Sequence, residues 1–572
     1  MALIGVLLTP YGVIGSVLVI ALLVYRAALP KPIPGIPHHK KSLQSIWGDM
    51  PALIEFSKNS NQTAMEYVTQ QALELDSPIY QLFLFPFKKP NVFITDHREG
   101  LDIMLRRQKD FDRCGFFQDV FGGVIPEHHM LMPTNDRFKA QRKLLADTMT
   151  PSFLTDVAAK HLYQQSQHLV DMWRVKAKVA GGRPFDMDDD INHFALDAIW
   201  AVAFGSEIDT IKTQRQFLEK LNSPDLPPDI DAPATLPRPQ LPDAFEAIMV
   251  LSHSMEDAAQ SPFPAFAHWC LRQAKPWKLA KAHKDRLVQD RLNDAKARLL
   301  NDDEANIACA TDHMVFREKK AAEKEGRDPQ FDSPVVKDEL LGFLIAGHET
   351  TATTITWAVK LLADHPEVQE RLRADFKAAY PDAVASGTLP SAEDIAAANV
   401  PFLDATMEEI LRIGQTFAGQ TRRARHDTEV LGCLVPRGTD VFLMANGPGF
   451  VMPDPFVRRI PESDRSVTSR ETKDRTVPEW DYSDIASFKP ERWIRDGEFD
   501  PNAGPSRQFG AGERGCFGRK LGLLKMRILF TLLIWSFDFP RLPEALSGYA
   551  AVAKTTRKPA QCYGRPCWTL SE

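Results

Sequence analysis

Apolar residues recur along most of the chain at intervals of three or four positions, the spacing of an amphipathic helix. The clearest helical stretches are residues 137–149, 191–204, 335–364 and 400–413. Alternating, strand-like stretches are fewer and cover residues 79–84, 91–95, 429–435 and 440–444. Since the two types do not alternate regularly and no repeat is visible, the pattern predicts a mainly α fold with a small β region.

Two segments interrupt this pattern without resembling domain linkers. Residues 223–242 contain seven prolines and predict an irregular surface insertion. Residues 461–479 are highly charged and rich in turn formers, so we expect a solvated loop there. We therefore predict a single large domain over residues 42–572.

The N-terminal residues 1–25 carry no charged side chain. As a helix they would reach roughly 35 Å, enough to cross the hydrocarbon core of a membrane, with Pro10 as a kink or as the true start. The basic flank after them places the rest of the chain in the cytosol by the positive-inside rule. We predict a transmembrane anchor at residues 1–25. A cleaved signal peptide is the alternative, disfavoured by the missing basic N-region and the long apolar run.

A basic, proline-rich spacer follows the predicted anchor, at residues 26–41. Prolines at positions 30, 32, 34 and 37 favour an extended, semi-rigid chain that cannot continue a helix. Such a spacer holds a globular domain at a fixed angle to the membrane surface.

Composition excludes some classes of protein and adds little else. A net charge of −6 and a pI near 6.2 argue against a nucleic-acid-binding protein. The seven cysteines are scattered, odd in number and form no C-x-x-C pair, so neither a disulfide framework nor a zinc site is indicated. A reducing compartment fits best.

Residues 509–518, Phe-Gly-Ala-Gly-Glu-Arg-Gly-Cys-Phe-Gly, carry the strongest chemical signal. Cys516 lies in a glycine-rich loop just before a helix-like run, where the helix dipole favours a thiolate. Glycines allow the backbone to approach a planar cofactor closely, and Arg514 is suited to pair a carboxylate of that cofactor. These features fit a haem iron with Cys516 as axial ligand. The alternative is an inert, buried structural cysteine.

This decapeptide resembles, at every defined position, the F-x-x-G-x-R-x-C-x-G signature of the cytochrome P-450 monooxygenases. The resemblance implies the cytochrome P-450 fold and haem b (iron protoporphyrin IX) as the cofactor. It also implies that Cys516 is the metal ligand and that Phe509, Gly510 and Arg514 contact the cofactor.

The segment Ala346-Gly347-His348-Glu349-Thr350-Thr351 breaks the rules of a long periodic helix. Glycine and threonine are poor helix formers, and such exceptions are expected at functional sites. We expect Ala346 and Gly347 to leave room beside the iron, and Glu349 and Thr350 to deliver protons as the catalytic pair. The string is similar to the family motif A-G-x-[DE]-T-[TS], in which His348 takes the unspecified position. A solvated surface patch is the alternative.

Glu409 and Arg412 lie one turn apart on a predicted helix, a spacing common among surface ion pairs. They match the family motif E-x-x-R, and Pro490-Glu491-Arg492-Trp493 follows at the expected distance. The resemblance implies a buried structural triad of Glu409, Arg412 and Arg492 that supports the haem loop. Trp493 replaces the usual phenylalanine.

Two further arginines match family positions that bind haem propionates. Arg422 matches the arginine that precedes the central sheet. Arg142 matches the W-x-x-x-R motif, although Phe138 replaces the tryptophan and one indole N–H is lost. For Arg142 a plain surface role is the alternative.

The resemblance implies a haem monooxygenase that inserts one oxygen atom of O2 into a lipophilic small molecule. It further implies electrons from NADPH through a flavoprotein, the NADPH–cytochrome reductase, and a place in the endoplasmic reticulum membrane, in contact with lipid. Basic residues beside the haem-binding elements are candidates for the reductase-docking face, or for an ordinary solvated face: Lys139, Lys143, Arg519, Lys520 and Lys525.

The substrate pocket is expected from segments with little charge, residues 114–130, 340–346, 416–420 and 549–554. The insertions resemble fungal biosynthetic members of the family, which indicates hydroxylation or epoxidation of a secondary metabolite. Two other functions stay open: an oxygen-independent haem-thiolate isomerase or dehydratase, and a non-catalytic haem-binding protein.

Overall fold

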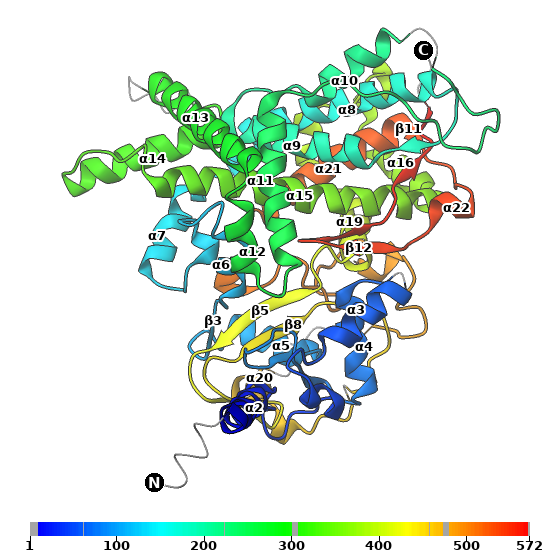
Figure 1. Cartoon of the computed structure of the whole chain (residues 1–572). Helices are drawn as coiled ribbons and strands as arrows, with labels where there is room; N and C mark the ends of the chain where they lie inside the picture. The colour runs from blue at the N-terminus through cyan, green and yellow to red at the C-terminus, as the bar shows by residue number, and fades with distance from the viewer. Residues whose placement is uncertain are drawn as a thin grey trace. The chain divides into compact units, whose positions relative to one another are not determined.

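The computed structural model describes residues 10–60, 62–221, 224–299, 307–456, 458–472 and 480–569 (Figure 1). The chain forms two compact units. Unit 1 consists of Met1–Cys114 and Gly419–Thr476, and unit 2 of Gly115–Ala418 and Val477–Glu572. The prediction of one catalytic domain over residues 42–572 stays a prediction.

Unit 1 is built around a five-stranded sheet in the order β1-β2-β8-β5-β3. The β2–β8 pair is parallel and the other three pairs are antiparallel. The rings of Tyr80, Phe93 and Phe442 stack across three neighbouring strands at 5.4 and 4.9 Å. Aromatic pairs of this kind stabilise a sheet beyond the area they bury. The strands are β1 (Ile79–Leu82), β2 (Asn91–Ile94), β3 (Phe111–Asp112), β5 (Gly419–Ala424) and β8 (Asp440–Met444).

A separate hairpin in unit 1 corrects one prediction. The expected strand at residues 429–435 is instead β6 (Thr428–Val430) paired with β7 (Cys433–Val435). Leu431 and Gly432 between them have φ angles of 48° and 72°, which reverse the chain. The helices of unit 1 are α2 (Pro10–Ala28), α3 (Met50–Asn59), α4 (Ala64–Glu74), α5 (His97–Leu105) and α20 (Val467–Glu471), with 3-10 turns η1 (Lys40–Gln44) and η6 (Glu462–Asp464).

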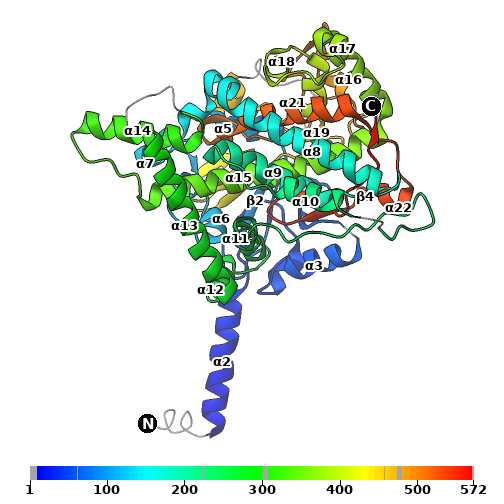
Figure 2. The ribbon, with the colours of Figure 1, turned by 90° about the horizontal axis from the view of Figure 1, so that it is seen from above.

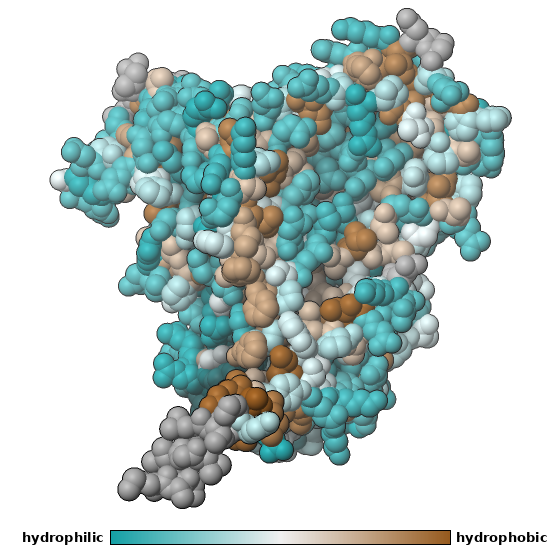
Figure 3. All heavy atoms as spheres, viewed as in Figure 1, coloured by the Kyte–Doolittle hydropathy of each residue, from teal (hydrophilic) through white to brown (hydrophobic). Residues whose placement is uncertain are grey.

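The predicted anchor lies partly outside the described residues, and its described part begins at Pro10. Helix α2 extends away from α3 (Figure 2), and its apolar side chains are visible in Figure 3. None of the helices formed by the described residues has the length and apolar character that crossing a bilayer requires. The transmembrane helix is thus not confirmed.

The proline-rich spacer is held against the sheet of unit 1 by one side chain. Gln81 of β1 accepts a hydrogen bond from the Ile33 N–H (2.8 Å) and donates to the carbonyls of Ile33 and Ile36 (2.9 and 2.7 Å). Both isoleucines are buried. Because its backbone groups and apolar side chains are both satisfied, this part of the spacer has a defined position in unit 1.

Unit 2 is mainly helical. Its helices are α6 (Phe116–Phe121), α7 (Asp136–Leu144), α8 (Ala159–Val179), α9 (Asp188–Phe204), α10 (Thr210–Glu219), α11 (Asp243–Ala259), α12 (Pro264–Leu271), α13 (Lys275–Arg298), α14 (Ala310–Glu325), α15 (Pro334–Asp364), α16 (Pro366–Ala379), α17 (Pro381–Ser386), α18 (Ala392–Ala397), α19 (Pro401–Gly414), α21 (Arg519–Ser536) and α22 (Glu544–Ser547).

Short elements complete unit 2. The 3-10 turns are η2 (His129–Leu131), η3 (Ala146–Met149), η8 (Pro490–Trp493) and η9 (Gly512–Arg514), and η4 (Phe153–Ala158) is a π-helix that continues into α8. Its strands form two-stranded pairs: β4 (Phe185–Asp186) with β14 (Tyr563–Gly564), β9 (Ile494–Arg495) with β10 (Glu498–Phe499), β11 (Phe537–Asp538) with β15 (Cys567–Trp568), and β12 (Ala551–Ala553) with β13 (Arg557–Pro559).

Helix α15 runs through the core of unit 2, packed along α9. Ser333 caps its first turn by accepting from the Val336 N–H, and Pro334 occupies its first position. All four predicted helices are present, at α7 with η3, α9, α15 and α19. The insertion, described from residue 224, is irregular up to residue 242, as predicted.

A buried carboxylate, Glu409 of α19, joins this helix to the chain that precedes the cysteine loop. It accepts from Arg412 Nε and Nη2 (2.8 and 2.7 Å), Arg492 Nε (3.0 Å), the Lys489 N–H (2.8 Å) and Trp493 Nε1 (2.8 Å). Glu409 is 0% exposed. The predicted structural triad is therefore confirmed, and the indole N–H of Trp493 adds a donor that phenylalanine lacks.

We predict that Trp493→Phe lowers the free energy of unfolding by about 1.5–3 kcal/mol, because a charged, buried oxygen loses a hydrogen bond where water cannot replace it. Urea unfolding measures the loss. Trp480→Phe is the matched control. Its ring packs 4.9 Å from that of Trp493, and its own Nε1 has no hydrogen-bond partner in the described part of the chain. Equal losses in both variants would contradict the role given to the indole N–H.

Candidate active site

The cysteine loop of unit 2 folds back on itself and exposes the thiol. The Cys516 N–H donates to the Phe509 carbonyl (2.8 Å), and the Gly515 N–H donates to that of Gly512 (2.9 Å). Gly510 and Gly512 have φ angles of 63° and 69°, which other residues rarely adopt. Cys516 is exposed just before α21.

Opposing effects act on the Cys516 thiol. Desolvation is the largest effect and raises the pKa of the thiol overall, while the Gly518 N–H and the charges of Arg142 and Arg519 lower it. Binding to a metal ion outweighs these effects, because a coordinating thiol is deprotonated outright. The loop therefore presents a sulfur ligand beside two cationic side chains.

Arg514 is held by the chain segment that precedes α7. Its Nε donates to Thr134 Oγ1 (2.7 Å) and its Nη2 to the Met132 carbonyl (2.5 Å). The guanidinium also lies 3.8 Å from the centre of the Phe138 ring. Phe138, which replaces the expected tryptophan, thus contributes a cation–π contact in place of an indole hydrogen bond.

Arg142 of α7 contacts the cysteine loop directly. Its Nη1 donates to the carbonyls of Glu513 (2.8 Å) and Gly515 (3.4 Å). The guanidinium lies 5.4 Å from the Phe517 ring centre. In this structure Arg142 fixes the loop, so a plain surface role is excluded, while contact with a propionate stays a prediction.

Glu339, near the start of α15, holds the segment that leads to Met132 and Thr134. Its carboxylate accepts from the His129 N–H and contacts His129 Nδ1, both at 2.7 Å. With His128 these side chains could hold a metal ion, since their ligand atoms lie within 4.8 Å of one another. However, the Met130 N–H donates to His128 Nδ1 (3.1 Å), which puts the proton of the neutral ring on the would-be ligand Nε2. We therefore interpret the cluster as a hydrogen-bonded support.

Helix α15 carries a run of side-chain hydrogen bonds to its own backbone at the predicted oxygen-activation motif. Thr350 Oγ1 donates to the Ala346 carbonyl (2.8 Å) and Thr351 Oγ1 to that of Gly347 (2.9 Å). A Cβ on Gly347 would lie 2.7 Å from Ile199 of α9, so this glycine permits helix packing. Only Ala346, which is exposed although the residues before it on the helix are buried, fits the expectation of space beside the iron.

Glu349 points away from its own helix towards the β12–β13 turn. It accepts hydrogen bonds from the hydroxyls of Thr555 and Thr556, the latter at 2.9 Å. Burial and the charge of Glu256 raise the pKa of the Glu349 carboxyl, and the two hydroxyls lower it. The net pKa is raised, which favours a carboxyl that can both take up and release a proton.

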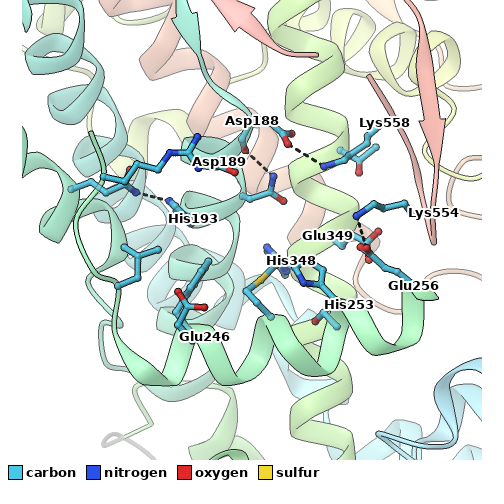
Figure 4. A pocket seen from close by; sticks show the side chains of 18 of the residues that line it. Asp188, Asp189, His193, Glu246, His253, Glu256, His348, Glu349, Lys554 and Lys558 are labelled. Carbon is cyan, nitrogen blue, oxygen red and sulfur yellow. Dashed lines mark hydrogen bonds and ion pairs between the residues drawn. The ribbon is translucent and has the colours of Figure 1, made fainter. Parts of the chain in front are cut away.

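A polar cavity of about 430 Å³ adjoins Glu349, between α9, α11, α15 and β12–β13 (Figure 4). Two ion pairs cross its wall, Glu256–Lys554 at 2.7 Å and Asp188–Lys558 at 3.1 Å. His348 also lines it, and its buried Nε2 has no hydrogen-bond partner among the described residues. The cavity therefore surrounds Glu349 with charged and polar side chains.

The remaining predicted site residues fall in different places. Arg422 lies on β5 of unit 1, buried, with its Nη1 donating to the Thr421 carbonyl (2.9 Å), and its propionate contact stays a prediction. Lys525 is 1% exposed, so its proposed place on a docking face is wrong. The other basic residues of that face are exposed: Lys139, Lys143, Arg519 and Lys520.

The residues of unit 2 fit a haem group. Cys516 and Ala346 are both exposed, and a Cβ placed on Gly518 would meet no atom within 4 Å beyond its neighbours in the chain. A planar cofactor needs such open backbone on one side and a thiol ligand beside it. Sequence reasoning missed the residues that orient the site, among them Thr134, Glu339 and Thr555, because each lies far along the chain from its partner.

Comparisons with known proteins agree with this site. The family model for cytochrome P450 matches residues 48–448 and 480–545. A cytochrome P450 monooxygenase of Pestalotiopsis microspora, GME11363, is 36% identical over 555 residues, covering 94% of this chain and 95% of its own. TRI13 of Fusarium sporotrichioides is 36% identical over 569 residues, 95% and 96% of the two chains, and xilC of Penicillium crustosum is 34% identical over 536 residues, 92% and 91%. Both are also named cytochrome P450 monooxygenases.

A crystal structure of a cytochrome P450 (CYP102L1) shares the fold, with a TM-score of 0.68 at 17% identity over 94% of this chain and 100% of that one. The predicted enzyme class, a monooxygenase among the oxidoreductases, is confirmed by the matches to curated relatives. The cysteine loop, the motif of α15 and these matches together place the chain in the cytochrome P450 family.

Proposed function

We propose that the protein is a haem-thiolate monooxygenase of fungal secondary metabolism that hydroxylates or epoxidises a lipophilic small molecule. The observation that carries the proposal is the exposed Cys516 thiol, in a glycine loop at the start of α21, in the same unit as the Glu349–Thr350 motif. The relatives add support, since one is named as a member of a fungal gene cluster, the Hps1-dma1 cluster of Dothistroma septosporum.

Haem b is the proposed cofactor. Cys516 would ligate its iron, and Arg514, Phe509 and Gly510 would contact it, with Arg142 and Arg422 as further partners of its carboxylates. When bound, a thiolate-ligated haem supplies O2 binding and favours O–O cleavage. The protein's part is to bind and orient the substrate, exclude water and manage protons.

Glu349 and Thr350 are proposed as the proton-handling pair. Consecutive residues of an α-helix point about 100° apart, so the two side chains serve different sides of α15. Glu349 faces the polar cavity, and we propose that it exchanges protons with solvent on that side. The Thr350 hydroxyl now donates to the Ala346 carbonyl. It can instead turn its proton towards a group bound beside Ala346.

We further propose that an NADPH-dependent flavoprotein reductase delivers the electrons. Arg519 and Lys520 begin the helix after Cys516, and Lys139 and Lys143 lie on α7, which contacts the same loop. All four are exposed, although Lys139 also pairs with Glu513 at 3.6 Å. A cationic surface next to the ligand loop suits an acidic redox partner.

Attachment to the endoplasmic reticulum membrane, with the catalytic part in the cytosol, is proposed from the N-terminal segment. Its described apolar side chains are exposed, including Ile14 (57%), Leu18 (64%) and Leu23 (59%). The basic residues after them, from Arg26 to Lys41, suit the cytosolic surface of a membrane.

We expect microsomes containing the protein and its reductase to convert a member of a lipophilic metabolite panel to a product heavier by one oxygen atom. Conversion should need NADPH and consume O2, which an isomerase or dehydratase would not. Cys516→Ser should lose both the product and the ferrous–CO absorption band of thiolate-ligated haem, because a neutral hydroxyl is a poor axial donor. Retention of both in the purified variant would refute the ligand assignment.

Thr350→Ala should leave folding and haem binding intact and uncouple NADPH oxidation from product formation. Proton transfer by one positioned side chain is worth about 10²-fold or more in rate, so electrons should drain into hydrogen peroxide. The measurement is the ratio of product to NADPH consumed, with peroxide assayed in parallel. Thr356→Ala is a control on the same helix, since its hydroxyl donates to the Thr353 carbonyl within α15. An unchanged ratio would remove Thr350 from the mechanism.

Deletion of residues 1–26 should release the protein only in part from the membrane fraction. We expect exposed residues of the insertion from residue 224, such as Ile230 (49% exposed), to keep some contact with lipid. Fractionation of cells that express the full-length and shortened chains measures the distribution. Recovery of the full-length chain in the soluble fraction would show that the anchor proposal is wrong.

A further inference from the structure

Lys525 is a buried lysine on α21, the helix that begins just after Cys516. It is 1% exposed, and its Nζ donates to the Gly347 carbonyl of α15 at 3.0 Å. In the described part of the chain no carboxylate lies within 4 Å of its Nζ. The ammonium group is therefore satisfied by a backbone carbonyl without an opposing charge.

Burying an unpaired ammonium is costly, and an apolar side chain would fill the same space without that cost. Desolvation lowers the pKa of Lys525 to about 7. A destabilising ammonium group in a packed helix interface points to a functional role for Lys525.

The group that Lys525 contacts lies at the start of the proton-handling motif. The Gly347 carbonyl accepts both Lys525 Nζ and, at 2.9 Å, the hydroxyl of Thr351. On the α9 side, Gly347 packs so closely to Ile199 that a Cβ would lie 2.7 Å from it. This turn of α15 is thus held by Ile199 of α9, by Lys525 of α21 and by the Thr351 hydroxyl of α15 itself. Glu349 and Thr350 follow in the same turn.

We propose that Lys525 is a positioning residue that fixes α15 at Gly347 and so sets the orientation of Glu349 and Thr350 relative to the helix behind Cys516. The inference rests on the roles proposed above for these two residues. Helix α21 would then have two roles. Its N-terminus lies next to the Cys516 thiol, and its Lys525 holds α15 through one hydrogen bond.

The charged surroundings of Lys525 are sparse. The helices packed against α21 are α8, α15, α16, α18 and α19. Among their described residues none forms an ion pair with Lys525. His348 of α15 is a titratable side chain that responds to it: burial lowers the pKa of His348 to about 3, with the charge of Lys525 as the next cause. A neutral His348 leaves the Lys525–Gly347 contact undisturbed.

Lys525→Met tests the proposal, with Lys360→Met as the matched control. Lys360 is also buried on a helix of this core, and burial lowers its pKa too, but it lies far along α15 from the motif. We expect Lys525→Met to keep the ferrous–CO band of thiolate-ligated haem while its ratio of product to NADPH falls several-fold and peroxide rises. Lys360→Met should keep the wild-type ratio.

Thermal unfolding of the same proteins against pH gives a readout independent of turnover. A lysine whose folded pKa is lowered destabilises the fold fully below about pH 7, and the penalty fades as pH rises towards 10.5. Both methionine variants should therefore gain Tm over wild type at pH 6 and lose that gain at higher pH. Only Lys525→Met should also change coupling, which separates a positioning role from burial alone.

A Lys525→Met enzyme with intact haem signal and wild-type coupling would overturn the inference, and so would uncoupling of the same size in Lys360→Met. If Lys525→Met fails to retain haem, Lys525→Leu, which also lacks a hydrogen-bond donor, replaces it in the same comparison. Thr350→Ala is measured in parallel to separate the role of Lys525 from that of Thr350. Unchanged coupling in that variant would refute the proposed role of Thr350 itself.

Discussion

The ligand loop depends on the hydrogen bonds that two buried carboxylates of α19 accept. Glu409 draws five donors from Arg412, Arg492, Trp493 and the Lys489 backbone into one site. Its neighbour Glu408 accepts from the Ser506 hydroxyl at 2.5 Å, shortly before the loop begins. A buried charge is tolerated only when its hydrogen-bonding capacity is used, so any displacement of these chains leaves an unsatisfied carboxylate. These contacts of α19 therefore fix the chain that leads into the cysteine loop.

The second constraint lies within α15, where residues needed for the site are residues that destabilise a regular helix. Threonine hydroxyls bond back to the carbonyls of Ala346, Gly347 and Thr350, a pattern that bends helices. The helix stays intact because its neighbours hold it, α9 through Ile199 and α21 through Lys525. Glu349 is in turn oriented by hydroxyls of the β12–β13 turn. The local cost of the motif is thus offset by tertiary contacts that a single helix could not supply.

Much of this arrangement can be predicted from the sequence, because periodic apolar spacing and dense motifs are local signals. They locate α9, α15, α19 and the Cys516 loop, and the motif match identifies the Glu409 triad. The hairpin at residues 428–435 looks like one strand in the sequence, since nothing in the apolar pattern shows that Leu431 takes a positive φ. Lys525 is wrongly expected on the surface, because a lysine's burial depends on the helix that packs against it. Partners such as Thr134 and Thr555 are set by tertiary folding and leave no local trace.

The two departures from the family motifs show how one local change is balanced by another. Phe138 cannot donate a hydrogen bond as tryptophan would, yet its ring supports the Arg514 guanidinium at 3.8 Å while Thr134 and Met132 accept from that group. Trp493 has the opposite effect, because it adds an indole N–H to a carboxylate that already binds two arginines. In both cases the charged group keeps its place while the aromatic neighbour changes. What the family pattern specifies here is the position of a charge, and the aromatic residue beside it can vary as long as that charge remains satisfied.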